Sequence, residues 1–141
     1  MQAVIIYDSV TGNTRNAANL IADEFYRHDI GANLFKVTEV NPEAVTEADL
    51  VVVGTWTDGL LIVGQKPGRH KRFTGLLPDL TGKRCAVFCT FALNPGRTLD
   101  KLQKIVEAHG GDVLGGMSIR RDDLTGGSAE FAERLVGAIA G

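Results

Sequence analysis

The chain has 141 residues, of which 44% are hydrophobic and 23% are charged, a composition typical of one ordinary globular domain. Its formal net charge of −2 argues against a nucleic-acid-binding protein that relies on overall charge. No apolar run approaches the roughly 20 residues that span a bilayer, and the N-terminus lacks the pattern of a secretory signal. We therefore expect a single domain over residues 1–141, in the cytoplasm and without a membrane span.

Apolar runs and helical periodicities alternate along the chain. Runs of apolar residues bounded by turn signals predict buried strands, and apolar residues at spacings of three and four predict amphipathic helices. The predicted strands are 3–7, 32–37, 50–53 (ended by Gly54), 84–90 and 113–119. The predicted helices are 13–28, 42–48, 73–77, 99–109 and a last helix capped by Ser128, and residues 55–72 are predicted to be irregular.

This alternation predicts an α/β fold of three layers, a doubly wound sandwich in which helices cover both faces of a five-stranded parallel sheet. In such folds ligands bind beyond the carboxyl ends of the strands, where the strand order reverses. We therefore expect the functional residues in the loops after the first, third and fourth strands. These loops are 8–14, 55–72 and 91–98.

The first of these loops reads DSVTGNT and leads directly into a predicted helix. A helix N-terminus presents unpaired N–H groups and attracts anions, and Gly12 lets the backbone approach a ligand closely. The hydroxyl groups of Ser9, Thr11 and Thr14 can donate to a phosphate oxygen. The lysine of a nucleotide triphosphate loop and the dinucleotide glycine fingerprint are both absent, so this pattern favours one terminal phosphate over an ordinary Ser/Thr-rich capping turn.

Two stretches together resemble the flavodoxins, which are small FMN-binding electron carriers. Residues 9–14 resemble their phosphate loop, and Gly54-Thr55-Trp56-Thr57-Asp58-Gly59 resembles their second flavin loop, which carries a stacking Trp. Residues 112–140 resemble the last strand and helix of the short-chain members. The resemblance implies the strand order 2-1-3-4-5 and an FMN cofactor. The cofactor-binding residues that it implies are Ser9, Val10, Thr11, Gly12, Asn13, Thr14, Thr55, Trp56, Thr57, Asp58, Gly59, Thr90, Phe91, Ala92, Leu93 and Asn94.

Some positions leave alternatives open. Trp56 lies just past the predicted third strand, where stacking on a flavin is favoured over the usual burial of Trp in a core. The third loop lacks the Tyr that flavodoxins often place over the outer flavin face. Phe91 or Leu93 covers the ring there, or that face is open. The resemblance also marks the peptide joining Thr57 to Asp58 as redox-sensitive, and a β-branched Thr resists positive φ.

The segment after Asp58 departs from the family. Four apolar residues, Leu60–Val63, precede a basic cluster made of Lys66, Arg69, His70, Lys71 and Arg72. The apolar residues either fold back onto the domain or form a contact patch. The basic residues are either a solvated loop or a docking site for an acidic partner.

Cys85 and Cys89 lie four residues apart in a predicted strand. Their Cα atoms would be about 13 Å apart, well beyond the roughly 7 Å limit for a disulfide, so we expect two buried reduced thiols. No His lies near them, and we expect neither a metal site nor a catalytic residue in the chain.

The favoured function is an FMN-binding, low-potential electron carrier that shuttles electrons between redox partner proteins, as a monomer or weak dimer. The alternative is an FMN-dependent NAD(P)H/quinone oxidoreductase on the same fold, since flavin hydride transfer also needs few side chains. A receiver-type signalling module is disfavoured because the third strand ends without an Asp. The Cys89-to-Arg97 spacing is too long for a phosphatase loop.

Overall fold

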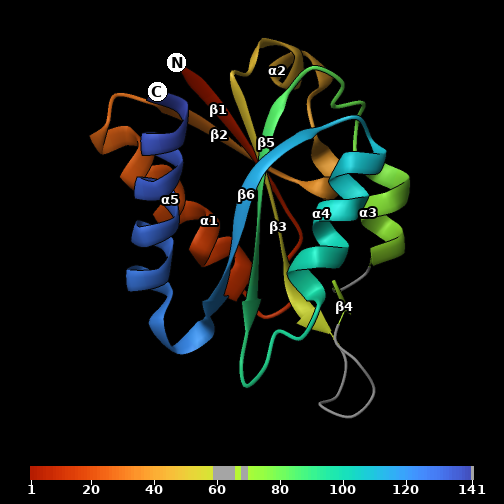
Figure 1. Cartoon of the computed structure of the whole chain (residues 1–141), viewed down its shortest axis with the longest axis vertical. Helices are drawn as coiled ribbons and strands as arrows, with labels where there is room; N and C mark the ends of the chain where they lie inside the picture. Colours follow the sequence, from red (N-terminus) through yellow and green to blue (C-terminus); the bar gives the residue numbers. More distant parts are fainter. Residues whose placement is uncertain (59–65, 68–69, 141) are drawn as a thin grey trace.

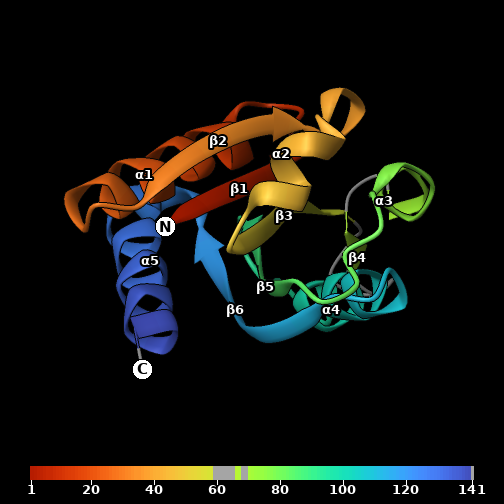
Figure 2. The same cartoon turned by 90° about the horizontal axis from the view of Figure 1, so that it is seen from above.

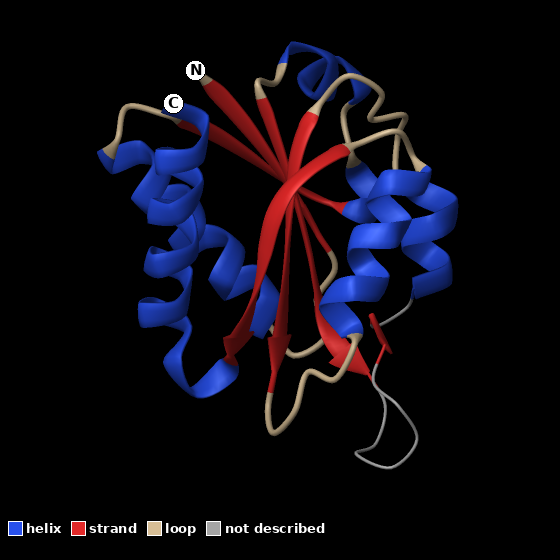
Figure 3. Ribbon diagram, viewed as in Figure 1, coloured by secondary structure: helices blue, strands red, loops and turns tan. Residues whose placement is uncertain are grey.

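Strongly apolar segments form a central sheet, and their carboxyl ends lie along one edge of it (Figures 1 and 3). The structure is a computed structural model that describes residues 1–58, 66–67 and 70–140. Its strands are β1 (Gln2–Tyr7), β2 (Gly31–Lys36), β3 (Leu50–Asp58), β4 (Lys66–Pro67), β5 (Arg84–Phe91) and β6 (Asp112–Arg120).

Helices connect these strands and cover both faces of the sheet (Figure 2). Two short 3₁₀ turns, η1 and η2, follow β2 and β6. Among the described residues, no helix is long and apolar enough to cross a membrane. The helical elements are α1 (Asn13–Arg27), η1 (Val37–Glu39), α2 (Pro42–Glu47), α3 (His70–Leu76), α4 (Thr98–Ala108), η2 (Arg121–Asp123) and α5 (Leu124–Ala140).

The sheet confirms the predicted fold class and strand order. Five strands pair in parallel in the order β2-β1-β3-β5-β6, which is 2-1-3-4-5 when only these five are counted. The short β4, which was not predicted, pairs antiparallel with the end of β3. The order reverses between β1 and β3, so the loop after β1 lies beside the end of β3, where the fold rule locates a ligand.

Alternate residues of the central strands enter two separate cores because the side chains of a strand point to opposite faces. Ile5 and Val52 lie in the core under α1 and α5, while Val4 and Val51 lie in the core under α2, α3 and α4. All four are completely buried. A strand that is buried on both faces reads as a continuous apolar run, and this explains why the strands were recognisable in the sequence.

The predicted end of the third strand at Gly54 is wrong. β3 continues to Asp58, and Gly54 pairs with Tyr7 on one side and with Phe88 on the other. A Cβ atom at Gly54 would overlap the Phe88 ring, which packs against Phe131 with 5.9 Å between ring centroids. The glycine is therefore a point of close approach inside the strand and not its end.

The last helix also begins earlier than predicted. Helix α5 starts at Leu124, and Ser128 is fully buried within it. The carboxylate of Asp123 accepts a hydrogen bond from the Gly126 N–H at 3.2 Å, so it supplies the cap that the sequence analysis assigned to Ser128. The helix predicted over 73–77 likewise begins earlier, at His70.

We predict that Gly54→Ala destabilises the fold by about 1–3 kcal/mol, the usual cost of forcing an extra methyl group into a packed core. Gly75→Ala is the matched control, because nothing lies within 4 Å of a Cβ atom at Gly75 in α3 and alanine is the better helix former. Urea denaturation followed by circular dichroism measures both changes. Equal stability of the two variants would contradict the close packing of Phe88 on Gly54.

Candidate functional site

The hydroxyl loop, residues 9–14, joins β1 to α1 and contains the N-cap of that helix. Gly12 occupies the cap in the left-handed region at φ 96°, where a side chain would be strained. No side chain in the described part of the chain caps α1, and its first turn holds no acidic residue. The N–H groups of this turn are therefore available to an anion.

Two hydroxyl groups in the loop accept a hydrogen bond within it and can still donate their own proton to a ligand. Ser9 Oγ accepts from the Gly12 N–H at 3.2 Å, and Thr11 Oγ1 accepts from Asn13 Nδ2 at 3.2 Å. A hydroxyl that accepts one hydrogen bond can still donate its own proton. These contacts orient both oxygens while leaving two O–H donors for a phosphate group.

Thr14 has a different environment from the other two hydroxyl residues. Its Oγ1 lies 2.9 Å from Thr90 Oγ1 in a buried hydrogen bond, which ties the first turn of α1 to the end of β5. Thr14 lines neither of the two hollows described below. Its donation to a phosphate stays a prediction, and its observed contact holds two parts of the site together.

A hollow of about 180 Å³ opens on one side of the loop; we call it the Trp56 hollow. Trp56 is half-buried near the end of β3, which extends farther than predicted and carries this side chain. Thr57 also lines this hollow, although its Oγ1 is itself buried. The hollow is lined by Val10, Thr11, Asn13, Trp56, Thr57, Thr90, Phe91, Ala92 and Arg121.

A second hollow of about 240 Å³ lies on the other side of the same loop; we call it the Lys36 hollow. Arg15 and Lys36 line it together with the acidic Asp8, so basic residues outnumber acidic ones beside the loop. The sequence analysis missed Lys36. Its signal was present, because it ends the strand predicted to lie beside β1. Its lining residues are Tyr7, Asp8, Ser9, Val10, Thr11, Gly12, Arg15 and Lys36.

The remaining predicted site residues lie at the ends of β3 and β5. Thr55 is completely buried, whereas Leu93 is 76% exposed and does not line the Trp56 hollow. Asn94 Oδ1 accepts from the Gly96 N–H at 2.9 Å and so shapes the loop after β5. Asp58 is described only as part of β3, and Gly59 lies outside the described residues, as do Leu60–Val63 and Arg69.

The peptide between Thr57 and Asp58 belongs to a strand pair. Thr57 faces Pro67 and Asp58 faces Lys66 across the antiparallel β3–β4 ladder. Asp29 is the one non-glycine residue with positive φ among those described, so Thr57 has the extended backbone that a β-branched residue favours. Whether this peptide responds to reduction stays a prediction.

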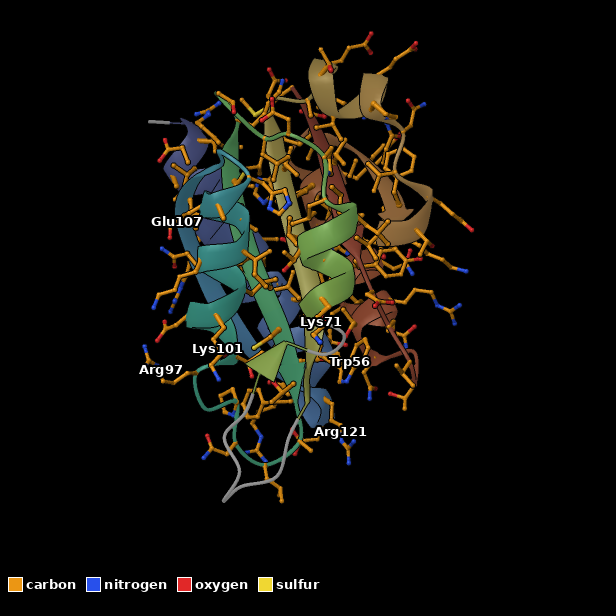
Figure 4. All side chains as sticks on the ribbon, turned by 90° about the vertical axis from the view of Figure 1, so that its right-hand side faces the viewer. Trp56, Lys71, Arg97, Lys101, Glu107 and Arg121 are labelled. Carbon is orange, nitrogen blue, oxygen red and sulfur yellow. The ribbon has the colours of Figure 1, made fainter. Side chains whose placement is uncertain are left out.

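Arg121 is a lining residue that the sequence analysis did not identify. It lies in η2, directly after β6, and its side chain reaches the Trp56 hollow (Figure 4). Functional residues were expected only in the loops after the first, third and fourth parallel strands. The position of Arg121, after the fifth parallel strand, was therefore not considered. The only signal was the pair Arg120-Arg121 at the predicted carboxyl end of a strand.

The two cysteines are buried free thiols, as predicted. Burial raises the pKa of Cys85 to about 12, and burial also raises the pKa of Cys89, whose Sγ lies 3.3 Å from Ser118 Oγ. Both thiols are therefore protonated at neutral pH and are poor nucleophiles. Within the described residues, no group of three or more His, Cys, Asp or Glu side chains is arranged to hold a metal ion.

The arrangement suits a phosphorylated ligand with a planar aromatic ring. The loop and the helix N-terminus supply donors for a phosphate group, and the neighbouring hollow supplies Trp56 and Phe91 for a ring. Val10 and Thr11 line both hollows, so one ligand could contact the two parts together.

Comparisons with known proteins agree with this reading. A family model described as flavodoxin matches residues 5–134. A protein of Bacillus subtilis described as probable flavodoxin 1 is 29% identical over 58 residues, a stretch that covers 41% of this chain and 37% of that protein.

Solved structures share the fold over almost the whole chain. Oxidised flavodoxin 2 from Bacillus cereus has a TM-score of 0.78 at 21% identity, with 98% of this chain and 99% of that chain covered. A flavodoxin from Streptococcus pneumoniae TIGR4 has a TM-score of 0.75 at 22% identity, with the same coverage. At these identities the structural likeness supports the fold alone.

Proposed function

We propose that this chain, which belongs to the flavodoxin family, binds FMN and carries electrons between redox partner proteins. Members of the family bind FMN. The observation that carries the proposal is the uncapped, hydroxyl-rich turn at α1, which lies directly beside a hollow lined by Trp56. A phosphate-binding turn without such a hollow, or a hollow without the turn, would suit other ligands equally well.

The residues of the hydroxyl loop fit the phosphate group of FMN. Gly12 leaves the backbone accessible, Ser9 and Thr11 offer hydroxyl protons, and the uncapped turn of α1 offers N–H groups. Arg15 and Lys36 lie at the adjoining hollow and add favourable charge without forming the lysine-dependent triphosphate site.

The Trp56 hollow fits the flavin ring. Trp56 and Phe91 provide aromatic surface for the ring. The bound ring itself accepts and returns electrons, so the protein contributes binding and orientation and needs no general acid or base. Among the described residues that line this hollow, none is an Asp, Glu, His or Cys.

The partner that we propose is an acidic redox protein. Lys71, Arg97, Lys101 and Arg121 lie at the same end of the molecule as Trp56 (Figure 4), and all four are exposed. These four charges would steer an acidic partner toward the flavin, and from its sequence we assign the same role to the basic segment Lys66–Arg72. We further propose a cytoplasmic location, because both cysteines are free thiols. The proposed oligomeric state is a monomer or weak dimer.

The function is tested by adding FMN in excess to the purified protein and removing the unbound flavin. We expect a yellow protein with one FMN per chain, which is reduced and reoxidised reversibly. NAD(P)H alone should reduce it slowly, whereas a reductase protein supplied with NADPH should reduce it rapidly. A colourless product would contradict FMN binding, and rapid direct reduction by NAD(P)H would support the quinone oxidoreductase instead.

Partner docking is tested by the double variant Lys71→Glu/Arg72→Glu. Loss of electrostatic steering should slow electron transfer with an acidic partner at low salt by about tenfold, and added salt should remove the difference. Lys104→Glu/Arg134→Glu makes the same change in net charge on the later parts of α4 and α5 and should have a smaller effect. Equal rates for the two double variants would exclude docking at the basic end.

A further inference from the structure

Arg121 brings a positive charge to the proposed flavin site. Neither phosphate binding by the hydroxyl loop nor ring stacking on Trp56 assigns a role to this charge. It lines the Trp56 hollow together with Thr57 and Phe91. The other lining residues that the structure describes are uncharged, so Arg121 is the one formal charge among them. A guanidinium stays protonated at any physiological pH.

The neighbouring Arg120 differs from Arg121 in its partners. Arg120 donates to Asp122 through Nε at 3.1 Å and Nη2 at 3.2 Å, and this pairing raises the pKa of Arg120 and lowers that of Asp122. Arg121 forms no ion pair within 4 Å and no hydrogen bond with any residue that the structure describes. Asp122 therefore pairs directly with Arg120, whereas its interaction with the Arg121 charge is a weaker one without a hydrogen bond.

A positive charge that lines this hollow acts differently on the two redox states of a flavin. The oxidised ring is neutral. When a protein reductant gives it two electrons and solvent gives N5 one proton, the ring gains one net negative charge and the reductant is oxidised by two electrons. A nearby positive charge stabilises the negative form and has little effect on the neutral one.

We propose that Arg121 sets the midpoint potential of the bound FMN by binding the reduced ring more tightly than the oxidised ring. This inference rests on the proposed function, since it assumes that the ring occupies the Trp56 hollow. The charge of Arg121 would stabilise the reduced flavin. The midpoint potential of this carrier would therefore be less negative than with a neutral residue at position 121.

The test is Arg121→Gln, which removes the charge and keeps a polar side chain. The dissociation constants of oxidised and fully reduced FMN are measured for each variant, with the midpoint potential determined against reference dyes. The preference for reduced over oxidised FMN should fall on the order of fivefold, by Coulomb's law across a partly solvated gap. For a two-electron couple this fold-change equals a shift of about 20 mV to more negative potential.

Two further variants make the result specific. Arg121→Lys keeps the charge and should restore most of the preference, whereas a purely steric role would leave it reduced. Arg97→Gln removes an exposed charge at the same end of the molecule, in a residue that does not line the Trp56 hollow, and should leave the preference nearly unchanged.

The remaining outcomes would overturn the proposed role of Arg121. If Arg121→Gln weakens both redox states equally or changes neither, the inference is wrong although FMN binding stands. An equal shift from Arg97→Gln would assign the effect to the field of the whole basic end and would also overturn it. If the unaltered protein binds no FMN, the proposed function fails first, and the two failures are thereby distinguished.

Discussion

The N–H groups in the first turn of α1 face the loop that follows β1, and no side chain among the described residues caps them. Gly12 produces this geometry, because its positive φ turns the chain into the helix without placing a Cβ atom in the loop. The helix dipole adds partial positive charge at the same point. The Trp56 hollow adjoins this turn, since Val10, Thr11 and Asn13 of the hydroxyl loop line it.

The core of the domain holds that turn in place. β1 is a central strand, paired with β2 and β3, so its carboxyl end is fixed from both sides. The buried hydrogen bond between Thr14 and Thr90 joins the helix to β5. Gly54 allows Phe88 to pack across β3 just before the strand delivers Trp56 to the hollow. The site therefore depends on rigid strands more than on its loops.

Sequence reasoning predicted the sheet and the hydroxyl loop because these features are local or periodic, whereas the strand order followed from the resemblance to the flavodoxins. Continuous apolar runs mark strands buried on both faces, and a glycine between hydroxyl residues marks an anion-binding turn. The extent of β3 was missed because a glycine inside a strand and one at its end look alike until Phe88 is seen above Gly54. Arg121 and Lys36 were missed because they lie at the ends of β6 and β2, and the prediction considered only the loops after the first, third and fourth parallel strands.

FMN binding by this protein depends on recognition of the phosphate group by the turn at α1. Comparing the affinities for FMN and riboflavin tests this most directly. The two ligands share the same ring and differ at the phosphate group. Isothermal titration should show FMN binding on the order of 100-fold more tightly, as expected for two or more charge-assisted hydrogen bonds. Equal affinity for FMN and riboflavin would contradict the account.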